Sequence, residues 1–177
     1  MKRQLCIVCL LLLGLAVYGV ETTTHDFTSN DVNEKPASFP TPYTVAEMTD
    51  HTRYTCVGEG ATFTNNPSVG GVCVQLPKGT ELIVSPAKEY LQEFYVYYSG
   101  AVTLTISLST DGSEWTPADE IGSIESPSST KRVYDLSGDY YIKIKNTTST
   151  NTNAYIVKLE YYTNPVSCPN CFRYIPQ

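Results

Sequence analysis

Residues Val102 to Ser109 read V-T-L-T-I-S-L-S, and an Asp111-Gly112 pair follows them. Aliphatic and hydroxyl side chains alternate over the whole stretch. Because successive side chains of a β-strand point to opposite faces, this period of two predicts a strand with one apolar, inward face. Asp-Gly is a turn signal between paired strands, so the stretch also predicts the first arm of a hairpin.

Similar segments occur on both sides of this strand, separated by residues that favour turns. They are residues 72–76, 81–85, 94–98, 132–136, 140–145 and 155–162. The 81–85 segment ends at Pro86. Short β-rich segments at this spacing are typical of a two-sheet sandwich. We therefore expect an all-β, antiparallel sandwich of jelly-roll type with about eight strands, covering residues 51–163.

The flanking segments differ from this domain. Residues 1–19 carry Lys2 and Arg3, then an apolar run that ends in small residues, as a cleaved signal peptide does. The run is shorter than the ~20 apolar residues that cross a membrane, and no second run of that length follows. We predict a secreted or extracytoplasmic protein, at the cell surface or in the periplasm, with no integral membrane segment. Residues 20–50 predict a linker or loosely attached arm, and residues 164–177 a cysteine-containing tail.

The composition is that of a globular, acidic protein. Apolar residues make up 41% of the chain and charged residues 17%. Without residues 1–19, 10 basic side chains face 18 acidic ones, which gives a formal charge of −8. Phosphate backbones require a clustered positive surface, so we expect no nucleic-acid partner.

Four cysteines follow the signal peptide: Cys56, Cys73, Cys168 and Cys171. In an exported chain they predict disulfides. We favour Cys56 with Cys73, and Cys168 with Cys171, although the sequence does not choose among the three connectivities. A zinc site or a redox dithiol at Cys168-Pro169-Asn170-Cys171 is the sharper alternative, without the spacing or the helical context that each requires.

No catalytic motif is present. The two histidines, His25 and His51, are not flanked by a nucleophile motif. The acidic residues between Glu114 and Glu125 are typical of a solvated surface. We therefore predict no enzyme, no catalytic residue, no metal and no cofactor, with bound calcium left open.

Aromatic residues are the strongest candidates for binding. Ten of the 14 tyrosines fall between Tyr90 and Tyr162. Alternation places Tyr95 and Tyr97 on the face opposite the aliphatic one, and Trp115 follows the Asp111 turn. Aromatic rings with polar neighbours stack on the apolar faces of sugars, so these four residues are the candidate ligand-binding set.

The hairpin Ser109-Thr110-Asp111-Gly112-Ser113-Glu114-Trp115-Thr116 resembles that of galactose-binding-like jelly rolls, the superfamily of discoidin domains and carbohydrate-binding modules. The closing segments, 140–146 and 154–159, are similar to the last strands of sandwich modules in secreted bacterial polysaccharide-handling proteins. The resemblance covers roughly residues 56 to 162. The sequence departs from discoidin domains, which are typically bracketed by terminal cysteines. The resemblance implies carbohydrate binding, although members of such a fold bind different ligands.

We therefore expect a non-catalytic module that recognises a polysaccharide or glycoconjugate. A structural or adhesive domain that binds another surface protein is the alternative, and a glycan-cleaving enzyme is the third. Asn146-Thr147-Thr148 also matches the acceptor pattern for N-glycosylation.

Overall fold

The computed structural model describes residues 20–28 and 44–164. Its longer strands are β1 (Glu21–Asp26), β3 (Arg53–Val57), β4 (Thr62–Asn66), β5 (Gly71–Leu76), β6 (Glu81–Ser99), β7 (Leu104–Ser109), β10 (Thr130–Tyr134), β11 (Gly138–Asn146) and β12 (Ala154–Thr163). The short strands are β2 (Val45–Glu47), β8 (Thr116–Pro117) and β9 (Ser123–Glu125), and two single 3-10 turns are η1 (Pro67–Val69) and η2 (Ala118–Glu120). The expected all-β class is confirmed, with twelve strands instead of about eight.

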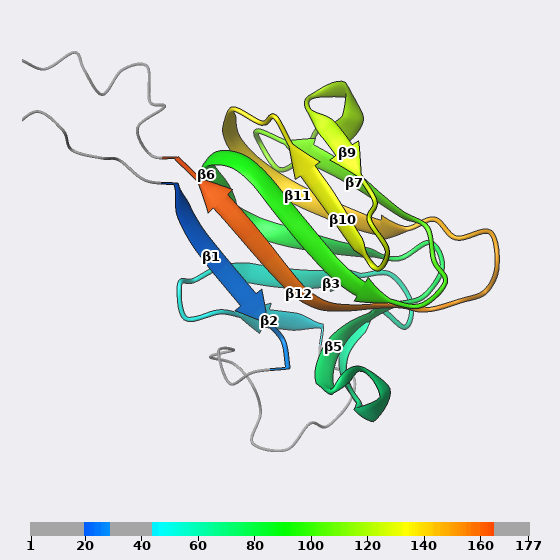
Figure 1. The fold of residues 1–177 in the computed structure, drawn as a ribbon. Helices are drawn as coiled ribbons and strands as arrows, with labels where there is room; N and C mark the ends of the chain where they lie inside the picture. The colour runs from blue at the N-terminus through cyan, green and yellow to red at the C-terminus, as the bar shows by residue number, and fades with distance from the viewer. Residues whose placement is uncertain (1–19, 29–43, 165–177) are drawn as a thin grey trace, which may run out of the picture.

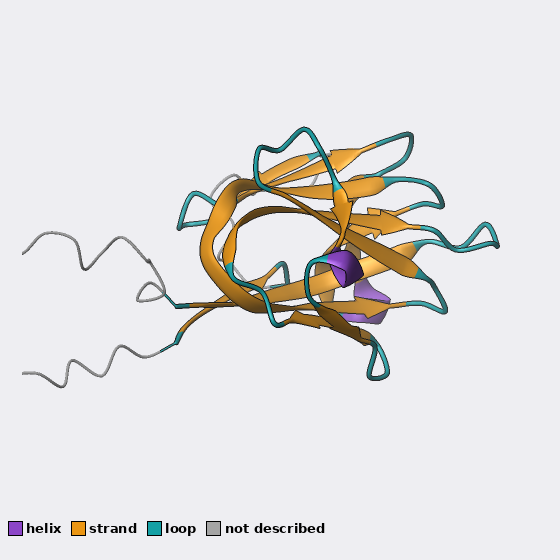
Figure 2. Ribbon diagram, turned by 90° about the horizontal axis from the view of Figure 1, so that it is seen from above, coloured by secondary structure: helices purple, strands orange, loops and turns teal. Residues whose placement is uncertain are grey.

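The strands pair antiparallel in one network that folds over into two layers (Figures 1 and 2). The first layer has the order β2–β3–β6–β11–β7–β8. The second has the order β4–β5–β12–β6–β10–β9. Strand β1 extends the second layer, because it pairs with β12 from Lys158 to Thr163, beyond the residues that pair with β5.

Strand β6 belongs to both layers. Its first residues pair with β3 and β11, and its last with β10 and β12. Between Val84 and Lys88, β6 advances four residues while β11 advances two, and from Lys88 to Leu91 it advances three against two. Extra residues on one strand of a pair are bulges, which bend that strand. Figure 1 shows β6 curling from one layer into the other.

We expected two separate strands here, the first ending at Pro86, and this expectation was wrong. Pro86 lies inside β6, within the bulged part of its pairing with β11. A proline is compatible with a strand at a bulge because the regular hydrogen-bond ladder is already interrupted there.

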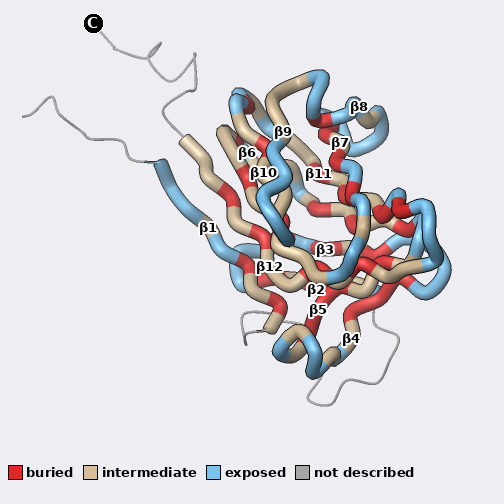
Figure 3. Tube along the Cα trace, turned by 45° about the vertical axis from the view of Figure 1, so that its right-hand side comes forward, coloured by how far each residue is buried: buried red, intermediate tan, exposed pale blue. Residues whose placement is uncertain are grey.

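The inward faces of the two layers form the core. Leu104, Ile106 and Leu108 are at most 3% exposed, as the alternation of this strand predicted. Each such side chain contributes roughly 1.5–3 kcal/mol through burial. They join a cluster that includes Val84 from β6 and Ile144 from β11. Figure 3 shows the buried segments gathered between the layers.

Residues 21–26 and 45–47 form strands, which corrects the expectation of a linker or loose arm at these positions. Residues 29–43 of that arm lie outside the described residues. Strand β1 is held by more than its pairing with β12. Phe27, just after β1, is fully buried and packs edge-to-face on Tyr54 and Phe63, with ring centroids 5.0 and 5.6 Å apart. The sequence pattern does not indicate β1, because its residues are threonines and other polar residues and the buried aromatic residue, Phe27, lies just after it.

The expected disulfide between Cys56 and Cys73 is absent, and both are buried free thiols. Cys56 on β3 belongs to the core between the layers. Cys73 alternates along β5 with Val72 and Val74, which do belong to that core, so its side chain faces away from it. Burial raises the pKa of Cys56 to about 12 and that of Cys73 to about 11, so both stay protonated at neutral pH. Cys168 and Cys171 lie outside the described residues.

Asn146 is completely buried and ties the end of β5 to the loop that follows β11. Its side-chain nitrogen donates to the carbonyl oxygens of Leu76 and Thr152, both at 2.8 Å. Its side-chain oxygen accepts from the backbone N–H of Thr148 at 3.1 Å and from the Thr148 hydroxyl at 2.6 Å. The acceptor nitrogen of the glycosylation pattern is therefore used inside the fold.

Within the described residues, no helix is long and apolar enough to span a bilayer. No group of three or more His, Cys, Asp or Glu side chains in residues 20–28 and 44–164 is placed to hold a metal ion.

We predict that Asn146→Ala lowers the free energy of unfolding by about 2–4 kcal/mol, because buried partners lose their hydrogen bonds. Urea denaturation measures this. The exposed neighbour Ser149 is a matched control: only its backbone oxygen is used, by Lys78, so Ser149→Ala should cost less than about 0.5 kcal/mol. Equal effects of the two variants would contradict the role given to Asn146.

Candidate functional site

The outer face of the second layer carries a strip of three tyrosines, Tyr95, Tyr97 and Tyr162, here called the tyrosine strip. Tyr95 and Tyr97 lie on β6 and point outward because Phe94 and Val96, which alternate with them, are buried. Tyr162 lies on the neighbouring strand β12. All three side chains are partly exposed.

The rings of the strip contact one another. The centroids of Tyr95 and Tyr97 are 6.2 Å apart with an interplanar angle of 23°. Tyr162 meets Tyr95 edge-to-face at 5.6 Å and 63°. Such distances lie in the range of favourable aromatic pairs, so the strip is one continuous aromatic surface.

An arginine on β10 borders the strip on one side. Arg132 pairs in register with Tyr95. Its Nη2 and Nε donate to the two carboxylate oxygens of Glu93 at 2.7 and 3.0 Å. The guanidinium also lies 4.4 Å from the ring centroid of Tyr134 and 5.7 Å from that of Tyr95. This fork arrangement fixes the guanidinium plane against the aromatic rings.

A lysine and a glutamate on β12 border the strip on the other side. Lys158 Nζ lies 3.9 Å from the ring centroid of Tyr97 and 2.7 Å from Glu160 Oε1. The Tyr97 hydroxyl donates to Glu160 Oε2 at 2.7 Å. Partial burial raises the pKa of Glu160, but the hydrogen bonds from Lys158 and Tyr97 outweigh this effect and lower the pKa.

These contacts keep Tyr95 and Tyr97 protonated. Its hydrogen bond to Glu93 raises the pKa of Tyr95 to about 12. Partial burial and the bond to Glu160 raise that of Tyr97 further. The strip thus presents neutral rings with a carboxylate and a cation fixed at each side. Such a surface can stack on an apolar face of a ligand while its rim exchanges hydrogen bonds with hydroxyl groups.

Trp115 and Asp111 lie elsewhere, between β7 and β8. Lys143 on β11 points outward from the first layer, because its neighbours Ile142 and Ile144 are buried. Lys143 Nζ lies 4.5 Å from the Trp115 ring, so Trp115 covers the outer face of the first layer. Of the four predicted residues, Tyr95 and Tyr97 therefore lie on the outer face opposite to that of Trp115, and Asp111 lies in the turn before Trp115. Their part in binding stays a prediction.

Asp111 is occupied by its own turn. Its Oδ1 accepts from the Ser109 hydroxyl at 2.9 Å and from the backbone N–H groups of Ser113 and Glu114 at 2.8 and 3.0 Å. These bonds hold the pKa of Asp111 well below its usual range. The predicted turn is present, and it occupies one of the two carboxylate oxygens of Asp111.

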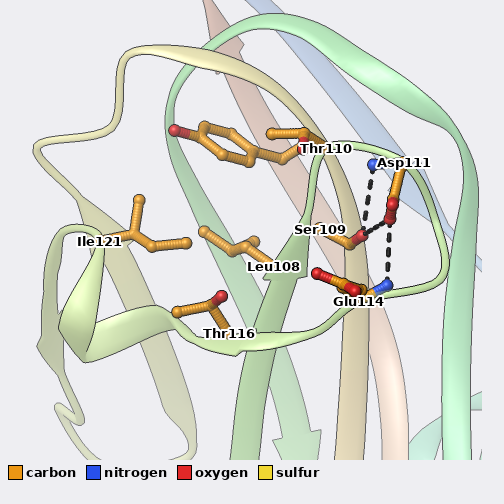
Figure 4. Close-up of a pocket in the computed structure, with 8 residues that line it drawn as sticks. Leu108, Ser109, Thr110, Asp111, Glu114, Thr116 and Ile121 are labelled. Carbon is orange, nitrogen blue, oxygen red and sulfur yellow. Dashed lines mark hydrogen bonds between the residues drawn. The ribbon is translucent and has the colours of Figure 1, made fainter.

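A small pocket of about 150 Å³ lies beside this turn (Figure 4). Asp111, Glu114 and Ser109 form its polar side, and Leu108, Ile121 and Tyr140 its apolar side. Drug-sized ligands occupy roughly 300–1,000 Å³. The pocket is therefore too small for more than a single small group.

A hydrogen-bonded chain runs from the exposed Asp50 into the core at Tyr161. His25 Nε2 lies 3.1 Å from Asp50 Oδ2, and its Nδ1 lies 2.6 Å from the Tyr54 hydroxyl. The Tyr54 and Tyr161 hydroxyls are 2.7 Å apart. Carboxylate, imidazole and hydroxyl in a row are the groups of a catalytic triad. His25 is only 4% exposed, and burial raises the pKa of both tyrosines, so this chain has the character of a core network.

Sequence reasoning missed the charged residues of the strip. Neither Arg132 nor Glu93 was among the candidate residues. The available signal was the alternation of β10 and β12, which places Arg132, Lys158 and Glu160 on outward faces. The alternation does not indicate that β6 pairs with both β10 and β12. This pairing brings the charged residues next to the tyrosines.

Known proteins with a distant structural likeness to this chain include a carbohydrate-binding module and a carbohydrate esterase. No family model matches the sequence, and no curated protein matches it significantly. A low-affinity xylan-binding module from Roseburia intestinalis is similar in structure, with a TM-score of 0.44 and 9% identity, over 83% of this chain and 98% of that one. A family two carbohydrate esterase from Cellvibrio japonicus has a TM-score of 0.40 and 8% identity, over 82% of this chain and 35% of that one. At these values the likeness concerns only the general arrangement of strands.

We predict a loss of stability at acid pH that depends on Asp50. Burial raises its pKa, but hydrogen bonds from Thr52 and the charge of Lys88 outweigh this and lower it from 3.8 to about 2. A lowered pKa in the folded state means that ionised Asp50 stabilises the fold above about pH 4, and that this contribution disappears as the pH falls towards 2. Because the side chain is 39% exposed, solvent screening limits the contribution to about 1 kcal/mol.

Urea denaturation of Asp50→Asn between pH 7 and pH 2 tests this prediction. The variant should be less stable at pH 7 and should converge with the parent protein near pH 2. Glu59, which is exposed, serves as the matched control, and Glu59→Gln should follow the parent curve. A constant difference at every pH would show that Asp50 acts without its charge.

Proposed function

We propose that the chain is a non-catalytic recognition module that binds a polysaccharide or glycoconjugate on the tyrosine strip. One observation carries this proposal: three contacting tyrosines lie on an outward sheet face between fixed donors and acceptors. A purely structural face has no need of contiguous, partly exposed rings with an ion pair along each side.

The chemistry of the strip suits a sugar. A pyranose ring has apolar C–H faces and a rim of hydroxyl groups. The faces stack on the rings of the strip, while the hydroxyls exchange hydrogen bonds with Glu93 and Glu160 as acceptors and with Arg132 as a donor. The ion pairs hold these groups in place beforehand, which reduces the entropy lost on binding.

The shape of the site favours a long ligand over a small one. The strip lies on the face of a sheet, across β6 and β12, and not in an enclosed pocket. An open surface buries little of each sugar, so affinity has to come from several sugars in a row. We therefore propose that the module binds internal segments of a polysaccharide with modest affinity per sugar.

The proposed location is outside the cytoplasm. The basic start and apolar run of residues 1–19 support export, and polysaccharides of cell walls and surfaces are available there. A non-enzymatic role agrees with the buried position of His25 and with the occupied carboxylate of Asp111.

We predict that Tyr95→Ala and Tyr97→Ala each weaken binding to a polysaccharide by about tenfold, because each removes stacking area. A glycan array identifies the ligand, and affinity electrophoresis in gels that contain it measures the change. Tyr141→Ala is the matched control, since Tyr141 is also partly exposed but lies on β11 of the first layer.

Trp115→Ala separates the two faces. If the tyrosine strip is the site, this variant binds as the parent protein does. Loss of binding in Trp115→Ala, with Tyr95→Ala and Tyr97→Ala unaffected, would move the site to the first layer and overturn the proposal. No glycan signal, with capture of a surface protein instead, would favour the adhesive alternative.

A further inference from the structure

A cleft of about 600 Å³ lies along the edge of β7, apart from the tyrosine strip. It is bordered by β7, β8, η2, β9 and β10, which Figure 1 places on the side of the sandwich remote from β1. Its lining includes Thr105, Ile106, Ser107, Asp119, Ile124 and Lys131. Its volume lies within the range of ligand pockets.

The path of the chain creates this cleft. Strand β8 pairs with β7 only at Ser107 and Leu108. The chain then turns into η2 at Ala118, which is buried and accepts from the N–H groups of Ile121 and Gly122. Within the described residues, no strand pairs with this side of Leu104–Ile106. The backbone groups on that side of β7 are therefore available to a ligand.

Lys131 extends into the cleft from the second layer. It pairs with the buried Val96, whereas its neighbour Arg132 pairs with the outward Tyr95, so the Lys131 side chain projects towards the space between the layers. Its Nζ donates to the Ser126 hydroxyl at 3.0 Å. Among the described residues no carboxylate lies within ion-pair distance of it, and burial lowers its pKa. A partly desolvated ammonium without a counter-charge is stabilised by an anion that enters the cleft.

The remaining groups restrict the anion to one that also carries hydroxyls. Asp119 on η2 adds a carboxylate to the lining, which accepts hydrogen bonds and repels a doubly charged group. The hydroxyls of Thr105 and Ser107 add neutral donors and acceptors, and Ile106 and Ile124 provide apolar contact. One carboxylate, several hydroxyls and an apolar ring face occur together in a hexuronic acid.

We propose that this cleft binds a uronic acid residue of an acidic oligosaccharide, with Lys131 holding the carboxylate and Asp119 accepting from the sugar hydroxyls. This inference rests on the proposed glycan recognition, and it adds a second site with its own ligand class. An extended acidic peptide is disfavoured because the unpaired stretch of β7 spans only Leu104–Ile106.

Isothermal titration calorimetry with trigalacturonic acid tests the proposal, and xylotriose is the neutral probe of the same length. The full chain should bind trigalacturonic acid, and more weakly as salt increases. Lys131→Gln should weaken this binding about tenfold, and Lys131→Arg should retain most of it. Lys78→Gln is the matched control, because Lys78 is exposed and also has no carboxylate partner in the part of the chain that the structure describes.

The double variant Tyr95→Ala/Tyr97→Ala separates the two proposals. It should lose binding of the polysaccharide that the glycan array identifies and keep that of trigalacturonic acid. Absence of trigalacturonic acid binding, or equal losses in Lys131→Gln and Lys78→Gln, would overturn the cleft proposal and leave the tyrosine strip untouched. Tighter binding of a triglutamate peptide than of trigalacturonic acid, sensitive to Lys131→Gln, would replace the sugar by a peptide.

Discussion

The fold depends on one strand that is shared by both layers. Because β6 pairs with β3 and β11 at its start and with β10 and β12 at its end, the two layers have a fixed offset and angle. In a sandwich made of separate sheets, apolar packing alone sets that geometry. Here the hydrogen-bond registers set it as well. The last part of β6 carries Tyr95 and Tyr97, so the constraint that joins the layers also positions the tyrosine strip.

Local pattern predicted the strands whose two faces differ in polarity. Leu104, Ile106 and Leu108 alternate with hydroxyls and are buried as expected. The pattern failed where tertiary contacts outweigh local composition. Pro86 was predicted to end a strand, although bulges accommodate it within β6. The polar sequence of β1 was predicted to be a linker, although the buried side chains of His25 and Phe27 hold this segment in the sheet.

The candidate site was predictable in part for the same reason. Alternation indicates which residues share the face of one strand, so Tyr95 and Tyr97 were found together. It does not indicate which strands are neighbours. For that reason Arg132 and Glu160 were missed, and Trp115 was grouped with tyrosines that lie on the opposite face. The cysteines also show that sequence distance does not indicate spatial contact. Cys56 and Cys73 are close in sequence, but Cys56 faces the core between the layers and Cys73 faces away from it.

The buried amide of Asn146 has a consequence for producing the protein. Oligosaccharide is attached to the Asn-x-Thr pattern during synthesis, before the chain has closed around it. A bulky sugar on this nitrogen could not be accommodated beside Leu76 and Thr152, and it would displace the loop that follows β11. A eukaryotic secretory host would thus modify the very atom that the native packing needs, whereas a bacterial host without this modification leaves it unaltered.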